Sequence, residues 1–187
     1  MGAFLIAQRI REQLTKRVIE GGIEDCVAPA SYELRVGSYR ESRIGDRTDL
    51  KPGEGVVVQP GGLLLVGTVE TVHLPNDLIG FLYLKSSYAR LGLLSWSQGI
   101  VEPGYSGGLT IVLNNASNVY VPIVGGQKIC HLMLSQADEA TDQPYRAEYQ
   151  GSASATPAKG GSAWGVVGDM LGKVSEGVTA AVLKAGS

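Results

Sequence analysis

The chain has 187 residues, 44% of them hydrophobic, which is enough for a sizeable core and excludes a globally disordered protein. Its 16 basic and 18 acidic residues give a formal net charge of −2, so the charge balance does not favour nucleic acid or an anionic membrane as a partner. The longest hydrophobic runs fall far below the roughly 18 residues that a membrane-spanning helix needs. We therefore expect a soluble, cytoplasmic protein without nucleic-acid or membrane partners.

The first 20 residues carry the pattern of an amphipathic helix. Hydrophobic side chains recur every four positions from Ile6 to Val18, and charged residues lie between them. Gly21 and Gly22 end the pattern, as glycine commonly does after a helix. The sequence therefore predicts a short N-terminal helix.

Short hydrophobic runs follow, and they are separated by Gly, Pro, Asn and Asp, which is typical of strands joined by tight turns. No helical pattern lies between these runs, so a doubly wound fold is disfavoured and an antiparallel barrel or jelly roll is expected. The 26 glycines, about twice the average share, agree with this prediction. The predicted strands are 31–36, 55–58, 63–68, 78–84, 109–114, 119–124 and 128–134.

The C-terminal part changes in composition. Residues 151–165 are almost entirely Gly, Ser, Ala, Thr and Pro, so we expect an arm that is mobile in the free protein. A second amphipathic pattern then predicts a C-terminal helix. The expected organisation is a β-barrel domain over 1–150, a flexible glycine-rich arm over 151–168 and a helix over 169–187. That helix would pack on the barrel or a neighbouring subunit, or bind a protein partner.

Metal and nucleophile chemistry are poorly represented in the sequence. The two histidines, His73 and His131, form no zinc-binding spacing with cysteine, and Cys26 and Cys130 form no disulfide framework. Cys130 and His131 are adjacent on a predicted strand and would point to opposite faces, so they form no working pair. We expect a buried cysteine beside a solvent-facing histidine.

Two neighbouring segments carry side chains suited to phosphate chemistry. Lys85, Ser86, Ser87 and Arg90 follow a hydrophobic strand, and hydroxyls with cations match phosphate oxygens. A glycine-flanked hairpin over 99–105 then places Glu102 near its tip, where partial burial would suit it to act as a general base. Solvated turns explain these residues equally well, so composition and spacing reach only a β-rich domain with a candidate anion site.

Four segments, in the order 29–37, 50–54, 72–80 and 85–93, resemble the trimeric dUTPase and dCTP deaminase superfamily, and the resemblance extends to about residue 168. The N-terminal half is more similar to the deaminase branch. The resemblance implies a mainly β protein, a dUTPase-like distorted β-barrel or jelly roll with a short N-terminal helix and a C-terminal helix. It also implies a homotrimer with active sites between subunits.

One residue separates the two branches. The deaminase branch places its catalytic glutamate where this chain has Val112, and valine cannot carry a proton to water or from the exocyclic amine. The dUTPase pattern fits the hairpin over 99–105 without a gap. The resemblance therefore favours a dUTPase, which converts dUTP and water to dUMP and diphosphate.

The resemblance also implies roles for individual residues. Glu102 takes the place of the aspartate that activates water, and Tyr105 that of the ring that packs on deoxyribose. The backbone of the hairpin would recognise the base. The remaining residues expected to bind the nucleotide are Lys85, Ser86, Ser87, Arg90, Gly99, Ile100, Val101, His131, Tyr149, Gln150, Lys159 and Trp164.

The expected nucleotide is a deoxyuridine or deoxycytidine triphosphate with Mg²⁺ bound mainly through its phosphates. In the arm, Lys159 would contact the γ-phosphate and Trp164 would stack on the base. Glutamate in place of aspartate at 102 moves the carboxylate by one methylene, and a displacement near 1 Å costs about 10²-fold in rate. Two alternatives stay open: a dCTP deaminase, bifunctional or not, and a catalytically degenerate nucleotide-binding or regulatory protein.

Overall fold

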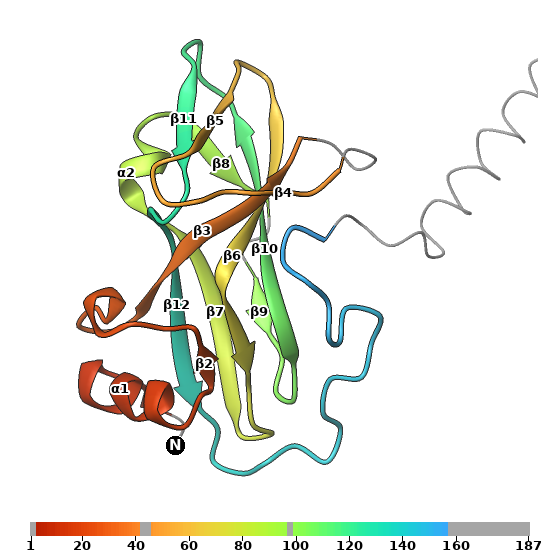
Figure 1. Cartoon of the computed structure of the whole chain (residues 1–187). Helices are drawn as coiled ribbons and strands as arrows, with labels where there is room; N and C mark the ends of the chain where they lie inside the picture. The colour runs from red at the N-terminus through yellow and green to blue at the C-terminus, as the bar shows by residue number, and fades with distance from the viewer. Residues whose placement is uncertain (1–2, 42–45, 97–98, 157–187) are drawn as a thin grey trace, which may run out of the picture. The chain divides into compact units, whose positions relative to one another are not determined.

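Antiparallel strands form most of the structure, a computed structural model that describes residues 3–41, 46–96 and 99–156 (Figure 1). Among the described residues, two short helices accompany the strands, α1 (Ala7–Thr15) and α2 (Ser86–Ala89), and a 3₁₀ turn covers Glu24–Cys26. The strands of the described residues are β1 (Ala3–Phe4), β2 (Ile19–Glu20), β3 (Tyr32–Arg40), β4 (Thr48–Asp49), β5 (Gly55–Val58), β6 (Leu63–His73), β7 (Leu78–Leu84), β8 (Leu93–Ser95), β9 (Ile100–Val101), β10 (Ser106–Asn115), β11 (Val121–Val124) and β12 (Lys128–Gln136).

Ten of these strands form one curled sheet in the order β8-β10-β6-β3-β12-β7-β9, with β1 added to β12, β2 to β6 and β4 to β3. The remaining two, β5 and β11, pair with each other. Every pairing is antiparallel. The predicted mainly β fold is therefore confirmed, and neighbouring strands in the sheet often lie far apart in the sequence (Figure 1).

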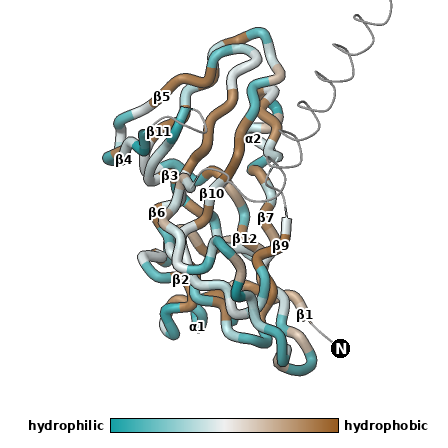
Figure 2. Tube along the Cα trace, turned by 90° about the vertical axis from the view of Figure 1, so that its right-hand side faces the viewer, coloured by the Kyte–Doolittle hydropathy of each residue, from teal (hydrophilic) through white to brown (hydrophobic). Residues whose placement is uncertain are grey.

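The core forms because hydrophobic residues alternate along the long strands. In β3, Tyr32, Leu34 and Val36 are fully buried, and the residues between them are only half-buried. Successive side chains of a strand point to opposite faces, so this alternation gives the sheet one hydrophobic face. Figure 2 shows hydrophobic residues along many of the strands. Each fully buried Leu or Ile side chain contributes about 1.5–3 kcal/mol to folding.

A buried carboxylate ties β3 to β6. Glu70 is fully buried and accepts hydrogen bonds from the Tyr32 hydroxyl at 3.0 Å, from the Arg35 backbone N–H at 2.9 Å and from Arg35 Nε at 2.6 Å. Arg35 Nη2 also donates to the Gly21 carbonyl at 2.7 Å. The charge on Glu70 is therefore paired and hydrogen-bonded, as a buried charge must be.

The N-terminal helix is shorter than the sequence pattern predicts. It begins at Ala7 and ends at Thr15, so the prediction of a helix over the first 20 residues is wrong for residues 3–6 and 16–20. Arg17 adopts a left-handed conformation with φ 58°, which an α-helix does not tolerate. Beyond it, Ile19 and Glu20 pair with Val72 and Thr71 of β6. Pairing with the sheet outweighs the helical periodicity.

The segment over 151–156 is bound to β10. Gly151 N–H donates to the Ser106 carbonyl at 2.7 Å, and Gly108 N–H donates to the Ser152 carbonyl at 2.9 Å. Thr156 N–H donates to Thr110 Oγ1 at 2.9 Å. The rest of the predicted arm and the predicted C-terminal helix lie outside the described residues.

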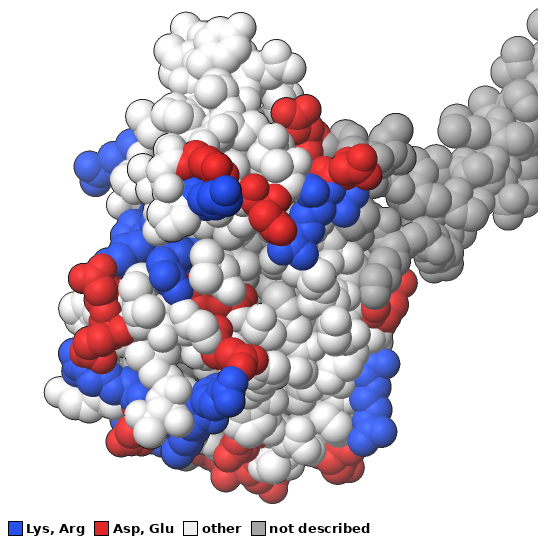
Figure 3. Space-filling model, viewed as in Figure 1, with Lys and Arg blue, Asp and Glu red and all other residues white. Residues whose placement is uncertain are grey.

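Charged side chains of both signs are interspersed on the face shown in Figure 3. This distribution agrees with the formal net charge of −2. Within the described residues, no helix has the length and hydrophobicity required to span a membrane.

Candidate functional site

The turn after β7 presents polar groups outward. Ser86, Ser87 and Arg90 are exposed, whereas Tyr88 between them is buried and donates a hydrogen bond from its hydroxyl to Gln127 Oε1 at 2.9 Å. Burial raises the pKa of Tyr88, so the phenol stays neutral and serves as an anchor. The turn therefore offers two hydroxyls and a guanidinium to a ligand.

Lys85 is held by an acidic partner. Its Nζ forms an ion pair with Glu33 Oε1, and Lys128 Nζ lies 3.3 Å from Glu33 Oε2. Burial acts to raise the pKa of Glu33, but hydrogen bonds and charge from Lys85 and Lys128 prevail and hold that pKa below its ordinary value. A phosphate group approaching Lys85 would therefore compete with an ionised Glu33.

His131 belongs to the same cluster. It lies opposite Glu33 in the pairing of β12 with β3, and its Nδ1 is 2.9 Å from Ser31 Oγ. Burial lowers the pKa of His131, and the nearby charge of Lys85 lowers it further. Cys130 is buried on the other face, so the expected separation of this cysteine and histidine is confirmed.

The hairpin places Glu102 in solvent and Tyr105 in the core. Glu102 is exposed at the turn after β9. Tyr105 is 8% exposed, its hydroxyl donates to the Gly108 carbonyl at 2.8 Å, and its ring meets Tyr145 edge-on at 5.5 Å between centroids. Burial raises the pKa of Tyr105 to about 12. Within one chain, the Tyr105 ring packs on protein and not on an open surface.

The hairpin and the α2 turn lie at opposite ends of β7. Val101 pairs with Gly80, so Glu102 lies beside the start of β7, whereas Lys85 follows its end. Six residues of strand at 3.3 Å each separate the two positions by about 20 Å. His131 pairs with Tyr83 and so lies at the Lys85 end. A single chain therefore does not bring the water-activating candidate to the phosphate-binding candidates.

Val112, the position that distinguishes the two branches, lies in β10. It pairs with Leu65 of β6, and its carbonyl accepts a hydrogen bond from Trp96 N–H at 3.0 Å. Val112 is half-buried, whereas its neighbours Ile111 and Leu113 are fully buried. Its side chain therefore belongs to the face of β10 opposite the core.

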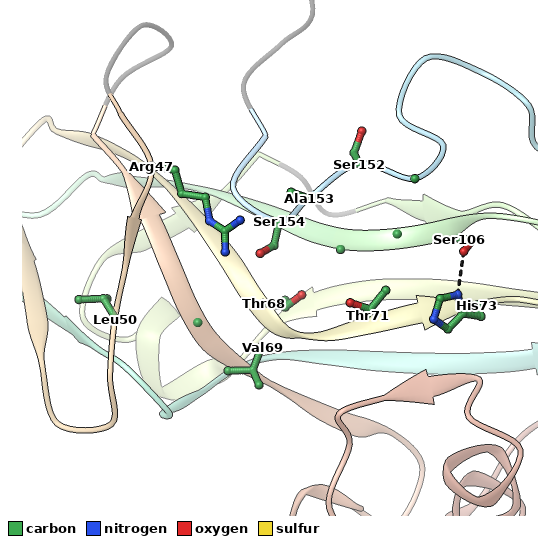
Figure 4. Close-up of a pocket in the computed structure, with 14 residues that line it drawn as sticks. Arg47, Leu50, Thr68, Val69, Thr71, His73, Ser106, Ser152, Ala153 and Ser154 are labelled. Carbon is green, nitrogen blue, oxygen red and sulfur yellow. Dashed lines mark hydrogen bonds between the residues drawn. The ribbon is translucent and has the colours of Figure 1, made fainter.

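A cavity of about 610 Å³ lies between the sheet and the segment over 151–154 (Figure 4). Its lining is mostly glycine and hydroxyl residues, and Arg47 and His73 are its titratable groups. Nothing in the sequence indicated this cavity, because it forms where segments far apart in the chain meet. The lining residues are Gly37, Arg47, Leu50, Thr68, Val69, Thr71, His73, Ser106, Gly107, Gly108, Gly151, Ser152, Ala153 and Ser154.

Two predicted site residues, Tyr149 and Gln150, directly precede Gly151 of the cavity lining. Gln150 accepts a hydrogen bond from Ser106 N–H at 3.1 Å and donates from Nε2 to the Gly104 carbonyl at 3.0 Å. Tyr149 packs against the core next to it. Lys159 and Trp164 lie outside the described residues. Among the described residues, no group of three or more His, Cys, Asp or Glu side chains could hold a metal ion.

Comparison with known proteins identifies the family. The model of the dCTP deaminase-like family matches residues 4–137, so the chain belongs to this family. It is 38% identical over 146 residues to the dCTP deaminase of Thermococcus kodakarensis, covering 77% of this chain and 90% of that protein. It is also 38% identical over 128 residues to the dUMP-forming dCTP deaminase of Rhodococcus erythropolis, covering 65% and 68%.

A solved structure supports the fold. The crystal structure of 2′-deoxycytidine 5′-triphosphate deaminase from Agrobacterium tumefaciens aligns with a TM-score of 0.61 at 20% sequence identity. The alignment covers 73% of this chain and 48% of that one, so this protein spans about half its length. The relatives named here are enzymes that act on nucleotides.

Proposed function

We propose that the protein binds a 2′-deoxypyrimidine nucleoside triphosphate, dCTP or dUTP, and cleaves it to the monophosphate and diphosphate. The observation that carries this proposal is the α2 turn, where Ser86, Ser87 and Arg90 are exposed together beside Lys85. Hydroxyl and guanidinium donors match phosphate oxygens in geometry and charge. We take the identity of the nucleotide from the names of the relatives, which are dCTP deaminases.

The proposed site is shared between subunits of a homotrimer. The separation of about 20 Å along β7 supports this arrangement, because Glu102 of one chain does not reach the α2 turn of the same chain. In the proposed trimer, the α2 turn of one subunit faces the hairpin of the next. Lys85 and His131 then contribute to the phosphate end of the site.

In the proposed reaction, Glu102 orients and deprotonates the water that attacks the α-phosphate. The hairpin backbone at Gly99, Ile100 and Val101 reads the base, and Tyr105 supports the hairpin from the core. Mg²⁺, held mainly by the phosphates, would neutralise part of their negative charge. Tyr149 and Gln150, and the arm residues Lys159 and Trp164, complete the nucleotide contacts in this proposal.

Deamination of dCTP is the second candidate function. The names of the relatives, including those that form dUMP, favour it over hydrolysis of dUTP alone. The side chain at 112 opposes it, because valine transfers no proton and deamination requires a group that does. A deaminating enzyme on this chain would need another proton carrier.

The test is turnover of the purified protein with dUTP, dCTP, dTTP and UTP in the presence of Mg²⁺, with diphosphate and ammonia followed together. Diphosphate without ammonia supports the proposed hydrolysis. Ammonia from dCTP supports the second candidate and contradicts the role assigned to Val112. Binding of dCTP or dUTP without turnover identifies a catalytically degenerate member of the family.

Two pairs of substitutions, each with a control, sharpen this test. Glu102→Gln is expected to abolish diphosphate release and keep nucleotide affinity, whereas Glu139→Gln, an exposed carboxylate outside the proposed site, leaves both unchanged. Val112→Glu is expected to introduce ammonia release from dCTP, and Val112→Gln, of the same size, is not. If Glu102→Gln turns over substrate at the unchanged rate, Glu102 does not activate the attacking water.

A further inference from the structure

A serine, a histidine and a glutamate form a hydrogen-bonded series at one end of the cavity. Ser106 Oγ lies 2.7 Å from His73 Nδ1, and His73 Nε2 lies 3.0 Å from Glu20 Oε2. Figure 4 shows the Ser106–His73 bond on the wall of the cavity. The three residues come from β10, β6 and β2, which pair side by side in the sheet.

The Glu20 carboxylate favours one tautomer of the His73 imidazole. Hydrogen bonds from His73 and Arg17 hold the pKa of Glu20 below its ordinary value, so Glu20 is an ionised acceptor. His73 Nε2 therefore carries the proton that it donates to Glu20. In the neutral imidazole with its proton on Nε2, Nδ1 is the acceptor for the hydrogen bond from the Ser106 hydroxyl. A cross-strand serine–histidine bond is ordinary, but a carboxylate that selects the tautomer is the pattern of an activated nucleophile.

We propose that the cavity is a further reaction site, in which Ser106 is a nucleophile toward small polar acyl esters, His73 is its general base and Glu20 positions His73. A bond forms between Ser106 Oγ and the carbonyl carbon as the hydroxyl proton passes to His73 Nδ1. The bond from that carbon to the ester oxygen then breaks, and the departing alcohol takes the proton from Nδ1. Water, deprotonated by the same nitrogen, hydrolyses the acyl-serine and restores the hydroxyl.

The surroundings of Ser106 suit this chemistry. Gly107 and Gly108 follow Ser106 directly, so no side chain of theirs covers the approach to the hydroxyl. Thr71 pairs with Gly108, and its side chain lies between His73 and Thr68 in the cavity (Figure 4). About 610 Å³ is within the range of small-molecule sites.

The first experiment uses the unmodified, full-length protein. Diisopropyl fluorophosphate reacts with activated serine hydroxyls, and peptide mass spectrometry locates the adduct. We expect the adduct on Ser106 and at least about tenfold slower labelling of Ser154, a cavity serine whose hydroxyl lies 3.5 Å from the Ser38 hydroxyl. Absence of an adduct on Ser106, or equal labelling of the two serines, overturns the proposal.

Hydrolysis of p-nitrophenyl acetate separates the roles of the three residues. Ser106→Ala and His73→Gln are expected to lower the rate by about 10²-fold or more, and Ser154→Ala is not. Glu20→Gln is expected to lower kcat with KM unchanged, because the carboxylate acts through His73 and touches no substrate. Retention of full activity by Ser106→Ala or His73→Gln contradicts the proposal. If a variant does not fold, the labelling of the unmodified protein tests the proposal instead. This inference stands apart from the proposed nucleotide reaction.

Discussion

At the scale of single residues, Glu70 shows how one buried charge is stabilised. Its partners, Tyr32 and Arg35, lie on the neighbouring strand, and Arg35 has a side chain that is 18% exposed. Glu70→Gln removes the charge and leaves the guanidinium without its counter-ion. We expect the free energy of unfolding to fall by about 3 kcal/mol, as measured by urea denaturation.

The matched control for this prediction is Glu24→Gln. Glu24 also pairs with an arginine, Arg11, at 2.5 Å, but its side chain is 65% exposed. An exposed pair contributes less than about 1 kcal/mol, so the control is expected to unfold almost as the unmodified protein does. Equal effects of the two substitutions would show that burial of Glu70 has no energetic role.

The lowered pKa of His131 predicts that the stability of the protein depends on pH. Its pKa in the folded protein is lowered by burial and by Lys85, so the unfolded chain binds a proton at His131 before the folded protein does. Stability is therefore expected to fall as the pH decreases from about 6.5, the ordinary value for histidine, toward the lowered pKa. Thermal unfolding across pH 7 to 5 measures this change.

His131→Asn is the comparison for the pH prediction. Asparagine has no proton to gain in this range, so the variant should lose less stability than the unmodified protein between pH 7 and pH 5. Below this range, Glu33 contributes in the same direction, because its lowered pKa makes its stabilising charge disappear as the carboxylate is protonated. Parallel curves for the two proteins would contradict the assignment to His131.

At the scale of elements, the contact of β10 with the segment over 151–156 depends on glycine. A Cβ atom on Gly108 would lie 2.5 Å from Ser154 N and 3.0 Å from Ser154 Cα, which are backbone atoms and cannot rotate away. Gly108→Ala is therefore expected to displace the segment from β10. Hydrogen exchange at the Gly151 and Thr156 amides should become faster in this variant.

Gly99→Ala provides the comparison, because a Cβ atom there meets none of the described residues within 4 Å. Its effect on exchange at Gly151 and Thr156 is expected to be negligible. Unchanged protection of these amides in Gly108→Ala would show that the segment tolerates a side chain beneath it.

The elements that could be predicted are those with a strong local pattern. The observed bounds of β5 and β7 equal the predicted ranges, and β6 and β10 extend the predicted strands. The short strands β1, β2, β4, β8 and β9 could not be predicted, because two or three residues carry no periodicity and form a strand only through their partners. Pairing with a partner strand also explains why the helix ends at Thr15 despite the pattern, because Ile19 and Glu20 pair with β6.

At the scale of the whole molecule, the proposed site between subunits predicts complementation. Arg90→Ala disables the α2 turn and Glu102→Gln disables the hairpin, so each variant alone should lack turnover. Random mixed trimers of the two place an intact turn against an intact hairpin at about a quarter of the sites. Co-refolding the variants and measuring diphosphate release should therefore restore a fraction of the activity.

Mixing each variant with a copy of itself is the control, and it should restore nothing. Failure of the mixed sample to recover activity, when both variants fold and form mixed trimers, would contradict a site shared between subunits.

The site could be predicted only in part, for a similar reason. Lys85, Ser86, Ser87 and Arg90 lie within six residues, so a local motif indicates them. The ends of the series, Glu20 and Ser106, lie 86 positions apart in the sequence, and the series depends on the register of three strands. Spacing along a chain carries no information on such register, which follows from packing across the whole sheet.

The backbone bonds between β10 and residues 151 and 152 have a further consequence for the state of the protein in solution. Near Ser106, one side of β10 is paired with β6, and the other side is occupied by these two residues. Without them, unpaired N–H and C=O groups would form an open edge on which strands of other molecules can add. Residues 151 and 152 therefore act as a cover against edge-to-edge aggregation, and a chain ending at 150 should aggregate where the full chain does not.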